Sequence, residues 1–308
     1  MKFKILSTNI SEKKGTVKLP INEITLDHKG VVGDAHAGHW HRQVSLLGIE
    51  SFEKFNTNSN RKVEFGEFGE NITTEGLLLY KTAPLDRFIC GEVELEVTQI
   101  GKHCHGSGCA IFVEVGNCVM PKEGIFCRVI KPGSIKNGDV FEYHPYIYKA
   151  LVITLSDRAS QGIYPDKSGP EIESMMLDWA ESKSLHFEIE RIVIGDDADL
   201  LKKHLEYAKD KYDFIITTGG TGIGPRDITV DIAQKMLDKE IPGIMEHIRV
   251  KYGAEKPNAL LSRGVAGIMG KAQVYTLPGS VKAVKEYMTE IQKTMFHLVL
   301  MMYGIDSH

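Results

Sequence analysis

The feature that most constrains this chain is an abrupt change from an apolar strand to glycines within residues 213–231, DFIITTGGTGIGPRDITVD. The apolar run at 214–216 is typical of a strand inside a parallel sheet. The glycines that follow lack the Cβ atoms that keep a backbone from folding tightly around an anion, so consecutive amide groups can converge on one point. We therefore expect residues 219–224 to form a phosphate-binding loop.

The residues after these glycines suit the same purpose. Pro225 stiffens the exit, Arg226 offers a bidentate donor to a phosphate, and Asp227 is a hard oxygen ligand of the kind that Mg²⁺ prefers. Residues 228–237 have helical apolar spacing. The sequence has no GxxxxGK[ST] motif, and the glycines do not have dinucleotide-binding spacing. A glycine-rich turn without a ligand remains the alternative.

Length and composition predict two ordinary globular domains. The chain has 308 residues, a net charge of −4 and no basic stripe, so a nucleic-acid partner is not expected. Five cysteines, all within 90–127, and no apolar signal-peptide core at the N-terminus favour a reducing cytoplasm. The apolar run MFHLVLMMYGI near the C-terminus is shorter than the roughly 20 residues that cross a bilayer, so we expect no membrane segment and a buried or subunit-contacting helix.

The N-terminal half reads as a mainly-β domain. Short strand-like pieces, such as FKILSTNI, QVSLLG, GLLLY, IFVEVG and GIFCRVI, are separated by glycines and turns. GEVELEV at 91–97 alternates apolar and charged residues, which predicts a half-exposed strand. A helix is expected only at 48–55. The pattern favours a β-barrel or a closely packed β-sheet domain.

The C-terminal half alternates strands and helices. Strands are predicted at 149–156 and 186–194 and helices at 171–183 and 198–209, before the strand that leads into the glycines. This order predicts an α/β domain, a three-layer sandwich with a mostly parallel sheet. Ligands bind outside the carboxyl ends of such strands. The rule places on one rim Ser156, Asp157, residues 195–197 and residues 219–227.

Two polar clusters of the N-terminal half have several interpretations. His36, His39 and His41 lie near Asp34, but their spacing matches no standard zinc motif. Tight turns with histidines lining a polar pocket, or a ligand pocket, are the other interpretations. A second cluster, FGEFGENIT, follows at 65–73.

The third cluster, KHCHGSGC at 102–109, contains a candidate reactive thiol. Protonated imidazoles beside Cys104 would lower its pKa and make it a nucleophile. Zinc binding by Cys104, His105 and Cys109 is the rival interpretation. The remaining cysteines, Cys90, Cys118 and Cys127, are expected to be inert.

The C-terminal half resembles the MogA/MoaB family of molybdopterin adenylyltransferases. The resemblance is carried by TTGGTGIGPRDITVD and, in order along the chain, by ITLSDRAS, DKSGP, EIPGIMEHIR, LLSRGVAGI and TLPGS. It implies transfer of AMP from ATP to the terminal phosphate of molybdopterin, in a homotrimer. It also implies that Asp196 and Asp227 are catalytic and bind Mg²⁺, although each could instead cap a helix. Val281 stands where many relatives have proline.

The same resemblance implies a set of residues that bind the cofactor substrate and the nucleotide. They are Ser156, Asp157, Gly219, Gly220, Thr221, Gly222, Arg226, Ser262, Arg263, Pro278, Gly279 and Ser280.

The N-terminal half resembles the MOSC family, the domain at the C-terminus of molybdenum cofactor sulfurases. The resemblance is carried by GDAHAGHWHRQVSL, GEFGENIT, LEVTQIGKHC, EGIFCRVIKPG and the GD of NGDVFEY. It implies a mostly β fold in which Cys104 matches a recurrent cysteine that carries sulfur or contacts the cofactor. The chain contains no pyridoxal-dependent desulfurase domain, so sulfur would have to come from elsewhere.

These observations predict a MOSC-like domain at 1–143, a linker at 144–148 and a MogA/MoaB-like domain at 149–308. The expected function is ATP- and Mg²⁺-dependent adenylylation of molybdopterin, beside a domain that handles the cofactor or sulfur. A non-catalytic protein that binds and delivers molybdopterin or its molybdenum form is the alternative. Other cofactor-synthesis proteins or molybdoenzymes are the expected protein partners.

Overall fold

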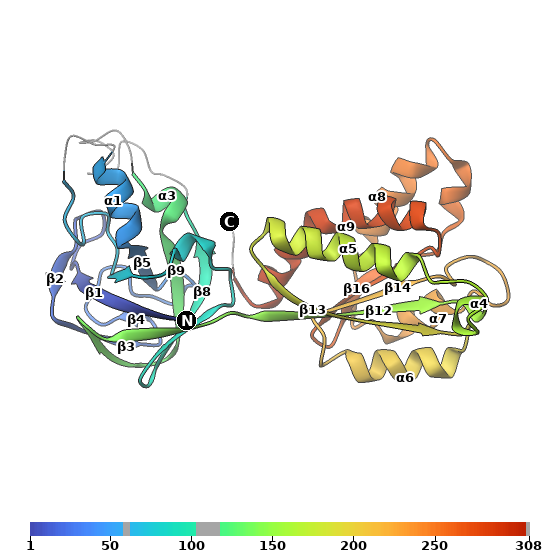
Figure 1. Cartoon of the computed structure of the whole chain (residues 1–308), viewed down its shortest axis with the longest axis horizontal. Coiled ribbons are helices and arrows are strands. Elements are labelled where there is room, and N and C mark those ends of the chain that lie inside the picture. Colours follow the sequence, from blue (N-terminus) through green and yellow to red (C-terminus); the bar gives the residue numbers. More distant parts are fainter. Residues whose placement is uncertain (58–61, 103–117, 306–308) are drawn as a thin grey trace. The chain divides into compact units, whose positions relative to one another are not determined.

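The computed structural model describes residues 1–57, 62–102 and 118–305. Apart from the last four residues of the chain, it divides into two compact units, Met1–Tyr146 and Ile147–Gly304 (Figure 1). The last strand of the first unit ends at His144, and the first strand of the second begins at Ile147. Within the expected linker at 144–148, residues 145 and 146 lie between these two strands.

The first unit is a closed β-barrel. Its main sheet has the strand order β11-β7-β8-β9-β5-β6-β1-β2, and β1 also pairs with β11, which closes the barrel. A smaller sheet has the order β10-β3-β4. The elements are β1 (Lys2–Ile10), β2 (Leu19–Ile21), β3 (Glu23–Asp27), β4 (Gly30–Val31), β5 (Val44–Gly48), α1 (Ile49–Thr57), β6 (Ile72–Glu75), η1 (Leu79–Lys81), β7 (Arg87–Cys90), β8 (Val93–Ile100), α3 (Met120–Glu123), β9 (Ile125–Lys131), β10 (Gly133–Lys136) and β11 (Val140–His144).

Alternate residues of the barrel strands form its core. Ile5, Leu46, Phe88 and Leu95 come from four different strands, and all are fully buried. The prediction of a barrel is confirmed, and so is the helix expected near residues 48–55, which is α1. The expectation that it is the only helix of this half is wrong, because α3 forms at Met120–Glu123.

The prediction that β8 is half exposed is wrong. Glu94 and Glu96, at the charged positions of the alternation, are only 4% and 3% exposed. Arg128 pairs with Glu96 at 2.6 Å, Lys131 pairs with Glu94 at 2.7 Å, and Arg87 bonds both carboxylates. Cations from neighbouring strands therefore cover carboxylates that an isolated strand would leave in water.

The prediction of a strand at GLLLY is also wrong. Its end forms the 3₁₀ turn η1, because the backbone amide and the hydroxyl of Thr82 both donate to the carbonyl oxygen of Leu79, at 3.0 and 2.7 Å. The expected strand IFVEVG at 111–116 lies outside the described residues.

The second unit is an α/β domain around one sheet. The strand order is β13-β12-β14-β17-β16-β15. The first four strands are parallel, whereas β16 is antiparallel to both of its neighbours, β17 and β15. The elements are β12 (Ile147–Leu155), α4 (Asp157–Ser160), α5 (Ser168–Ser182), β13 (His186–Ile194), α6 (Ala198–Ala208), β14 (Phe214–Thr218), α7 (Thr229–Met236), β15 (Lys239–Glu240), α8 (Pro242–Gly253), η3 (Pro257–Leu261), β16 (Ala266–Met269), β17 (Ala272–Leu277) and α9 (Val281–Met302).

Helices cover both faces of this sheet. Figure 1 shows α5, α8 and α9 on one side and α6 and α7 on the other. Leu201 and Leu205 of α6 and Ala233 of α7 pack into one core with Ile153 and Ile215 of the central strands. The predicted mostly parallel α/β architecture is confirmed.

The C-terminal helix α9 buries most of its apolar face within its own unit. Met295 and Val299 of the run MFHLVLMMYG are buried, whereas Met301 is 62% exposed. Phe296, Leu298, Leu300 and Met302 are partly exposed, so the run keeps some apolar surface in water. The expected homotrimer remains a prediction. Among the described residues, no helix has the length and apolar character needed to cross a membrane.

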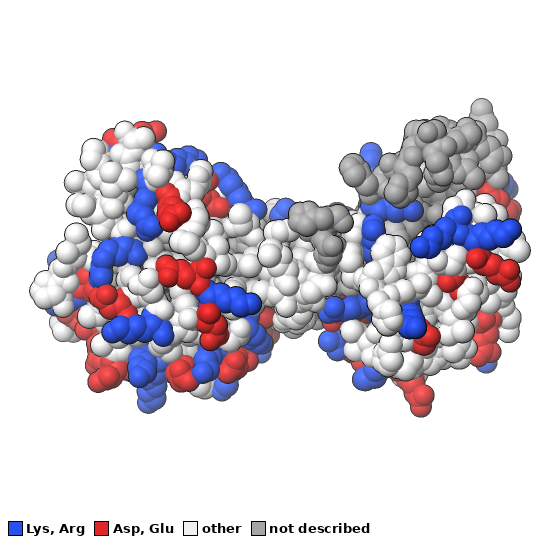
Figure 2. All heavy atoms as spheres, turned by 180° about the vertical axis from the view of Figure 1, so that it is seen from behind, with Lys and Arg blue, Asp and Glu red and all other residues white. Residues whose placement is uncertain are grey.

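Charge is distributed evenly on the face drawn in Figure 2. Lys and Arg side chains alternate there with Asp and Glu over both units. This mixture agrees with the scattered charges of the sequence.

Candidate functional site

The glycine loop leaves β14 in a conformation that requires glycine. Gly219 has a φ of +101°, and a Cβ atom there would collide with the carbonyl oxygen of Leu155 at the end of β12. A Cβ at Gly222 would lie 2.7 Å from a carboxylate oxygen of Asp227. The loop is thus closed tightly against the neighbouring strand end and against its own aspartate.

Three aspartates gather at the carboxyl ends of three parallel strands. Asp157 follows β12, Asp196 follows β13, and Asp227 belongs to the loop after β14. The amide of Asp196 donates to Oδ1 of Asp157 at 2.9 Å, and Arg226 donates to Oδ2 of Asp157 at 3.1 Å. The predicted rim residues are therefore brought together from segments far apart in the sequence.

Asp196 lies close to two other negatively charged side chains, Asp157 and Asp227. Its pKa is raised above the ordinary value by burial first and then by the negative charge of Asp157, while Arg226 opposes this and Asp227 adds to it. A bound cation would relieve this crowding. Among the described residues, no group of three or more His, Cys, Asp or Glu is arranged as a metal cage. Mg²⁺ usually takes only one or two carboxylates and completes its shell with water and phosphates, so the donors present fit that ion.

Helix capping does not account for Asp196 or Asp227. Asp197 caps α6, because its side chain accepts from the amide of Leu200 at 3.0 Å. The N-cap position of α7 is Ile228, without a side-chain bond, and Asp227 instead accepts from the amide of Gly224 at 2.7 Å. The catalytic and metal-binding roles of both aspartates remain predictions.

Arg263 holds the glycine loop in shape. Its Nε donates to the carbonyl of Gly222 at 2.8 Å, and its Nη2 donates to the carbonyl of Asp227 at 3.0 Å. Two further bonds, at 2.9 and 3.0 Å, reach the carboxylate of Asp231. Because these donors are bonded within the protein, the geometry favours a positioning role for Arg263 over the direct ligand contact implied by the resemblance.

The TLPGS segment lies directly against the loop. Thr218 donates from its hydroxyl to the carbonyl of Pro278 at 2.9 Å, and a Cβ on Gly279 would lie 3.4 Å from the Cα of Gly219. The hydroxyl of Ser280 caps α9. The structure thus places this segment at the rim, as predicted.

Other predicted rim residues have structural bonds of their own. The hydroxyl of Ser156 caps α4. Thr221 is 5% exposed and accepts from the amide of Arg263 at 3.1 Å. Ser262 ends η3, next to Arg263.

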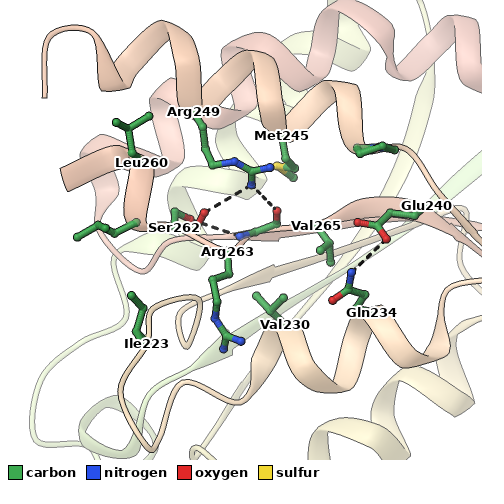
Figure 3. Close-up of a pocket in the computed structure, with 13 residues that line it drawn as sticks. Ile223, Val230, Gln234, Glu240, Met245, Arg249, Leu260, Ser262, Arg263 and Val265 are labelled. Atoms are coloured by element: carbon green, nitrogen blue, oxygen red, sulfur yellow. Dashed lines mark hydrogen bonds between the residues drawn. The ribbon is translucent and has the colours of Figure 1, made fainter. Parts of the chain in front are cut away.

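A pocket of about 460 Å³ adjoins the loop through Ile223 and Arg263 (Figure 3). Met245 and Leu260 contribute apolar surface, and none of the three aspartates belongs to its lining. Arg249 points from α8 toward the η3 segment and donates to the carbonyl of Gly264 at 3.1 Å. This pocket was not foreseen from the sequence, because its walls come from α7, α8 and η3, which lie apart along the chain.

Sequence reasoning also missed Tyr164. Its hydroxyl lies 3.0 Å from Oγ of Ser156, and the guanidinium of Arg158 lies 5.6 Å from its ring centre. The available signal was an aromatic residue between two of the rim motifs.

In the N-terminal unit, Asp34 is the centre of a buried polar cluster. Lys18 forms an ion pair with Asp34, and each side chain is 1% exposed. Nδ1 of His36 lies 3.4 Å from the same carboxylate. Burial opposes ionisation of Asp34, but hydrogen bonds from His36 and Lys18 lower its pKa well below the ordinary value. Lys18 was not predicted as part of this cluster.

Two zinc sites were considered for this unit, and the structure describes the residues of only one of them. Within residues 1–57, 62–102 and 118–305, no metal-binding group of three such side chains occurs, so zinc at His36, His39 and His41 gains no support. Cys104, His105 and Cys109 lie outside the described residues, and their roles remain predictions.

A mostly parallel α/β sheet whose strand ends carry a glycine loop, an arginine and grouped carboxylates is the arrangement expected of a domain for a phosphate-bearing ligand. The family model "Probable molybdopterin binding domain" matches residues 151–297, and the "MOSC domain" model matches residues 33–142.

Curated relatives share the second unit. The molybdopterin adenylyltransferase of Helicobacter pylori J99 is 35% identical over 156 residues, covering 50% of this chain and 86% of the relative. The Escherichia coli K12 enzyme of the same name is 34% identical over 152 residues, covering 48% and 76%. Gephyrin of Dictyostelium discoideum is 36% identical over 155 residues, covering 48% and 21%. The second unit of the chain belongs to the MogA/MoaB family of molybdenum cofactor biosynthesis, and within the first unit residues 33–142 match the MOSC model. Both predicted resemblances are confirmed.

Proposed function

We propose that the second unit transfers AMP from ATP to the terminal phosphate of molybdopterin. The observation that carries this proposal is the junction of the glycine loop, Arg226 and the three aspartates at one edge of the sheet. An oxygen of the molybdopterin phosphate attacks the α-phosphorus of ATP. The bond between that phosphorus and the β-phosphate oxygen breaks, and pyrophosphate leaves with the electron pair.

The residues of the chain have separate tasks in this reaction. The amides of the glycine loop and Arg226 bind phosphate oxygens and offset their negative charge, which lets two anions approach. Arg226 is 78% exposed, so it is free to turn from Asp157 to a ligand. Arg263 keeps the loop carbonyls turned away from the ligand side, because it bonds those of Gly222 and Asp227.

Magnesium fits this arrangement. Asp196 and Asp227 would hold it, and it would supply positive charge to the nucleotide phosphates. Burial and then repulsion from Asp157 raise the pKa of Asp196, and a cation bound there would relieve that repulsion.

The first unit, which contains the MOSC match, is proposed to bind the cofactor or to carry its sulfur. Cys104 is the proposed thiol, and a sulfur donor outside this chain is required. A homotrimer is proposed from the family resemblance, as are other proteins of molybdenum cofactor synthesis, or molybdoenzymes, as protein partners.

The test of the proposed function is pyrophosphate release by the full-length protein incubated with ATP, Mg²⁺ and molybdopterin. Release that depends on all three supports adenylylation. Tight molybdopterin binding without pyrophosphate release supports the alternative, a protein that binds and delivers the cofactor.

A further inference from the structure

An exposed aromatic side chain stands at the rim that carries the glycine loop. Tyr164 is 43% exposed and its neighbour Ile163 is 65% exposed, in the segment between α4 and α5. Two adjacent large apolar side chains at the edge of a candidate site leave apolar surface in water that a ligand would cover.

Tyr164 is held in place from one end. Its hydroxyl is hydrogen-bonded to Ser156 at 3.0 Å, at the point where β12 ends. Arg158 approaches the ring at 5.6 Å from its centre. A side chain that is anchored in this way loses little conformational freedom when a ligand binds, which is the condition for an effective stacking surface.

The position of Tyr164 relates it directly to the phosphates. Ser156 precedes Asp157, and Asp157 receives the hydrogen bond from Arg226 at the exit of the glycine loop. Tyr164 is thus linked through Ser156 and Asp157 to Arg226, which brings its ring to the same rim as the phosphate-binding groups. A ligand whose phosphate reaches Arg226 would bring an attached ring system toward Tyr164.

We infer that Tyr164 is a stacking platform for a planar heteroaromatic ring carried by the phosphate-bearing ligand. Aromatic side chains bind nucleobases and similar rings through their faces, with little dependence on the ring's hydrogen-bonding pattern. The adenine of ATP and the pterin of molybdopterin are the two sources of such a ring. This inference rests on the proposed function, because that function places the phosphates on the glycine loop.

The test compares ligands with and without a ring. Isothermal titration calorimetry on the full chain measures the affinity for ATP, for hydroxymethylpterin diphosphate and for tripolyphosphate, which has phosphates only. Tyr164→Ala should weaken binding of one ring-bearing ligand by about 5- to 100-fold, the range known for loss of one aromatic–base stack. Binding of tripolyphosphate should change by less than about twofold, because no stack is lost.

Three further variants separate the ring from the hydroxyl and from general damage. Tyr164→Phe keeps the ring and should bind within about threefold of the unchanged protein. Tyr164→Trp should bind at least as tightly, and stacking should quench its fluorescence. Tyr207→Ala removes an exposed tyrosine of α6 and is the matched control, with no expected change.

The outcomes distinguish this inference from the proposed function. The ring-bearing ligand that Tyr164→Ala weakens identifies the source of the ring. Equal loss for all three ligands, no loss for any, or equal loss in Tyr164→Phe and Tyr164→Ala overturns the stacking role while leaving adenylylation intact. Failure of the unchanged protein to bind ATP contradicts adenylylation. The affinity of Tyr164→Ala for the pterin ligand then still tests the stacking role. Binding of neither ring-bearing ligand to the unchanged protein contradicts both.

Discussion

Oδ1 of Asp157 accepts a hydrogen bond from the backbone amide of Asp196, 2.9 Å away, and so ties the end of β12 to the end of β13. The bond fixes the backbone of Asp196 beside a negative charge. The pKa of Asp196 is raised in consequence, after the larger effect of burial. A nearby cation, or a metal bound to phosphate, would stabilise the ionised form of a carboxylate in such surroundings. This is the basis of the role proposed for Asp196.

Asp196→Asn and Asp227→Asn should each slow adenylylation by about 100-fold or more, the scale of losing one positioned electrostatic group. Both variants should keep the fold, because neither side chain caps a helix. Steady-state pyrophosphate release measures the effect. Asp199→Asn, in the first turn of α6, is the control and should keep its activity. Full activity in a folded Asp196 or Asp227 variant would refute the assignment.

Arg263→Lys should weaken ATP binding by roughly tenfold. A lysine has no planar fork and cannot bond Gly222, Asp227 and Asp231 together, so the glycine loop would lose its shape. Asp231→Asn should act in the same direction and less strongly, because it removes only the charged partner. Calorimetry with ATP checks both, and Arg191→Lys, whose partner is Glu173 at 2.7 Å, is the control. Unchanged affinity in Arg263→Lys would rule out the positioning role.

Lys18→Met should destabilise the N-terminal unit by about 3–5 kcal/mol, the usual cost of leaving one partner of a buried ion pair alone. Asp34 would keep amide donors from Ser11 and Asn71, at 3.1 and 3.2 Å, so the lower end is expected. Urea unfolding measures the change. Lys29→Met, an exposed substitution in the same unit, should be close to neutral. Equal stability of the two variants would show that the pair contributes nothing.

The contact between α8 and α9 at Glu290 should weaken in acid. Hydrogen bonds from Lys251 and Lys293, and more weakly from His247, lower its pKa to about 2. A carboxyl whose pKa is lower in the folded state stabilises the fold above its unfolded pKa of about 4.5 and loses this contribution as the pH falls toward 2.

Glu290→Gln should therefore lower the melting temperature at pH 7 by about 2–4 °C and have a smaller effect at pH 3. Calorimetric scans at both pH values check this. A difference between variant and unchanged protein that stays constant with pH would contradict the assignment.

The cysteines should differ in reactivity. Burial raises the pKa of Cys127 well above its ordinary value, and burial also raises the pKa of Cys90. Both thiols should therefore react slowly near neutral pH, whereas Cys104, beside two histidines, should be alkylated first. Mass spectrometry after brief iodoacetamide treatment resolves the sites. Uniform alkylation would leave Cys104 without a special role, and stoichiometric zinc lost in Cys104→Ser would favour the metal interpretation.

Local patterns predicted much of the fold and part of the site. The strand before the glycines and the alternation of strands and helices were legible because periodicity and glycine content act locally. The carboxyl-end rule correctly grouped Asp157, Asp196 and the glycine loop. The sequence alone could not tell whether Asp196 or Asp197 caps the helix that follows. The structure shows that Asp197 caps α6.

What the sequence did not predict depends on distant contacts. Lys18 reads as a surface residue, and only its pairing with Asp34 makes its burial possible. Glu94 and Glu96 read as solvent-facing until Arg87 and Arg128 are seen to cover them. The position of Tyr164 likewise depends on a turn that the sequence does not specify.

Pyrophosphate release tests the central claim most directly. The full-length protein is incubated with ATP, Mg²⁺ and molybdopterin, and pyrophosphate is measured against reactions that lack one component and against Asp227→Asn. We predict pyrophosphate release equal to the molybdopterin consumed, absent without molybdopterin and reduced about 100-fold in Asp227→Asn. Molybdopterin binding without release of pyrophosphate, or equal release in Asp227→Asn, would contradict this prediction.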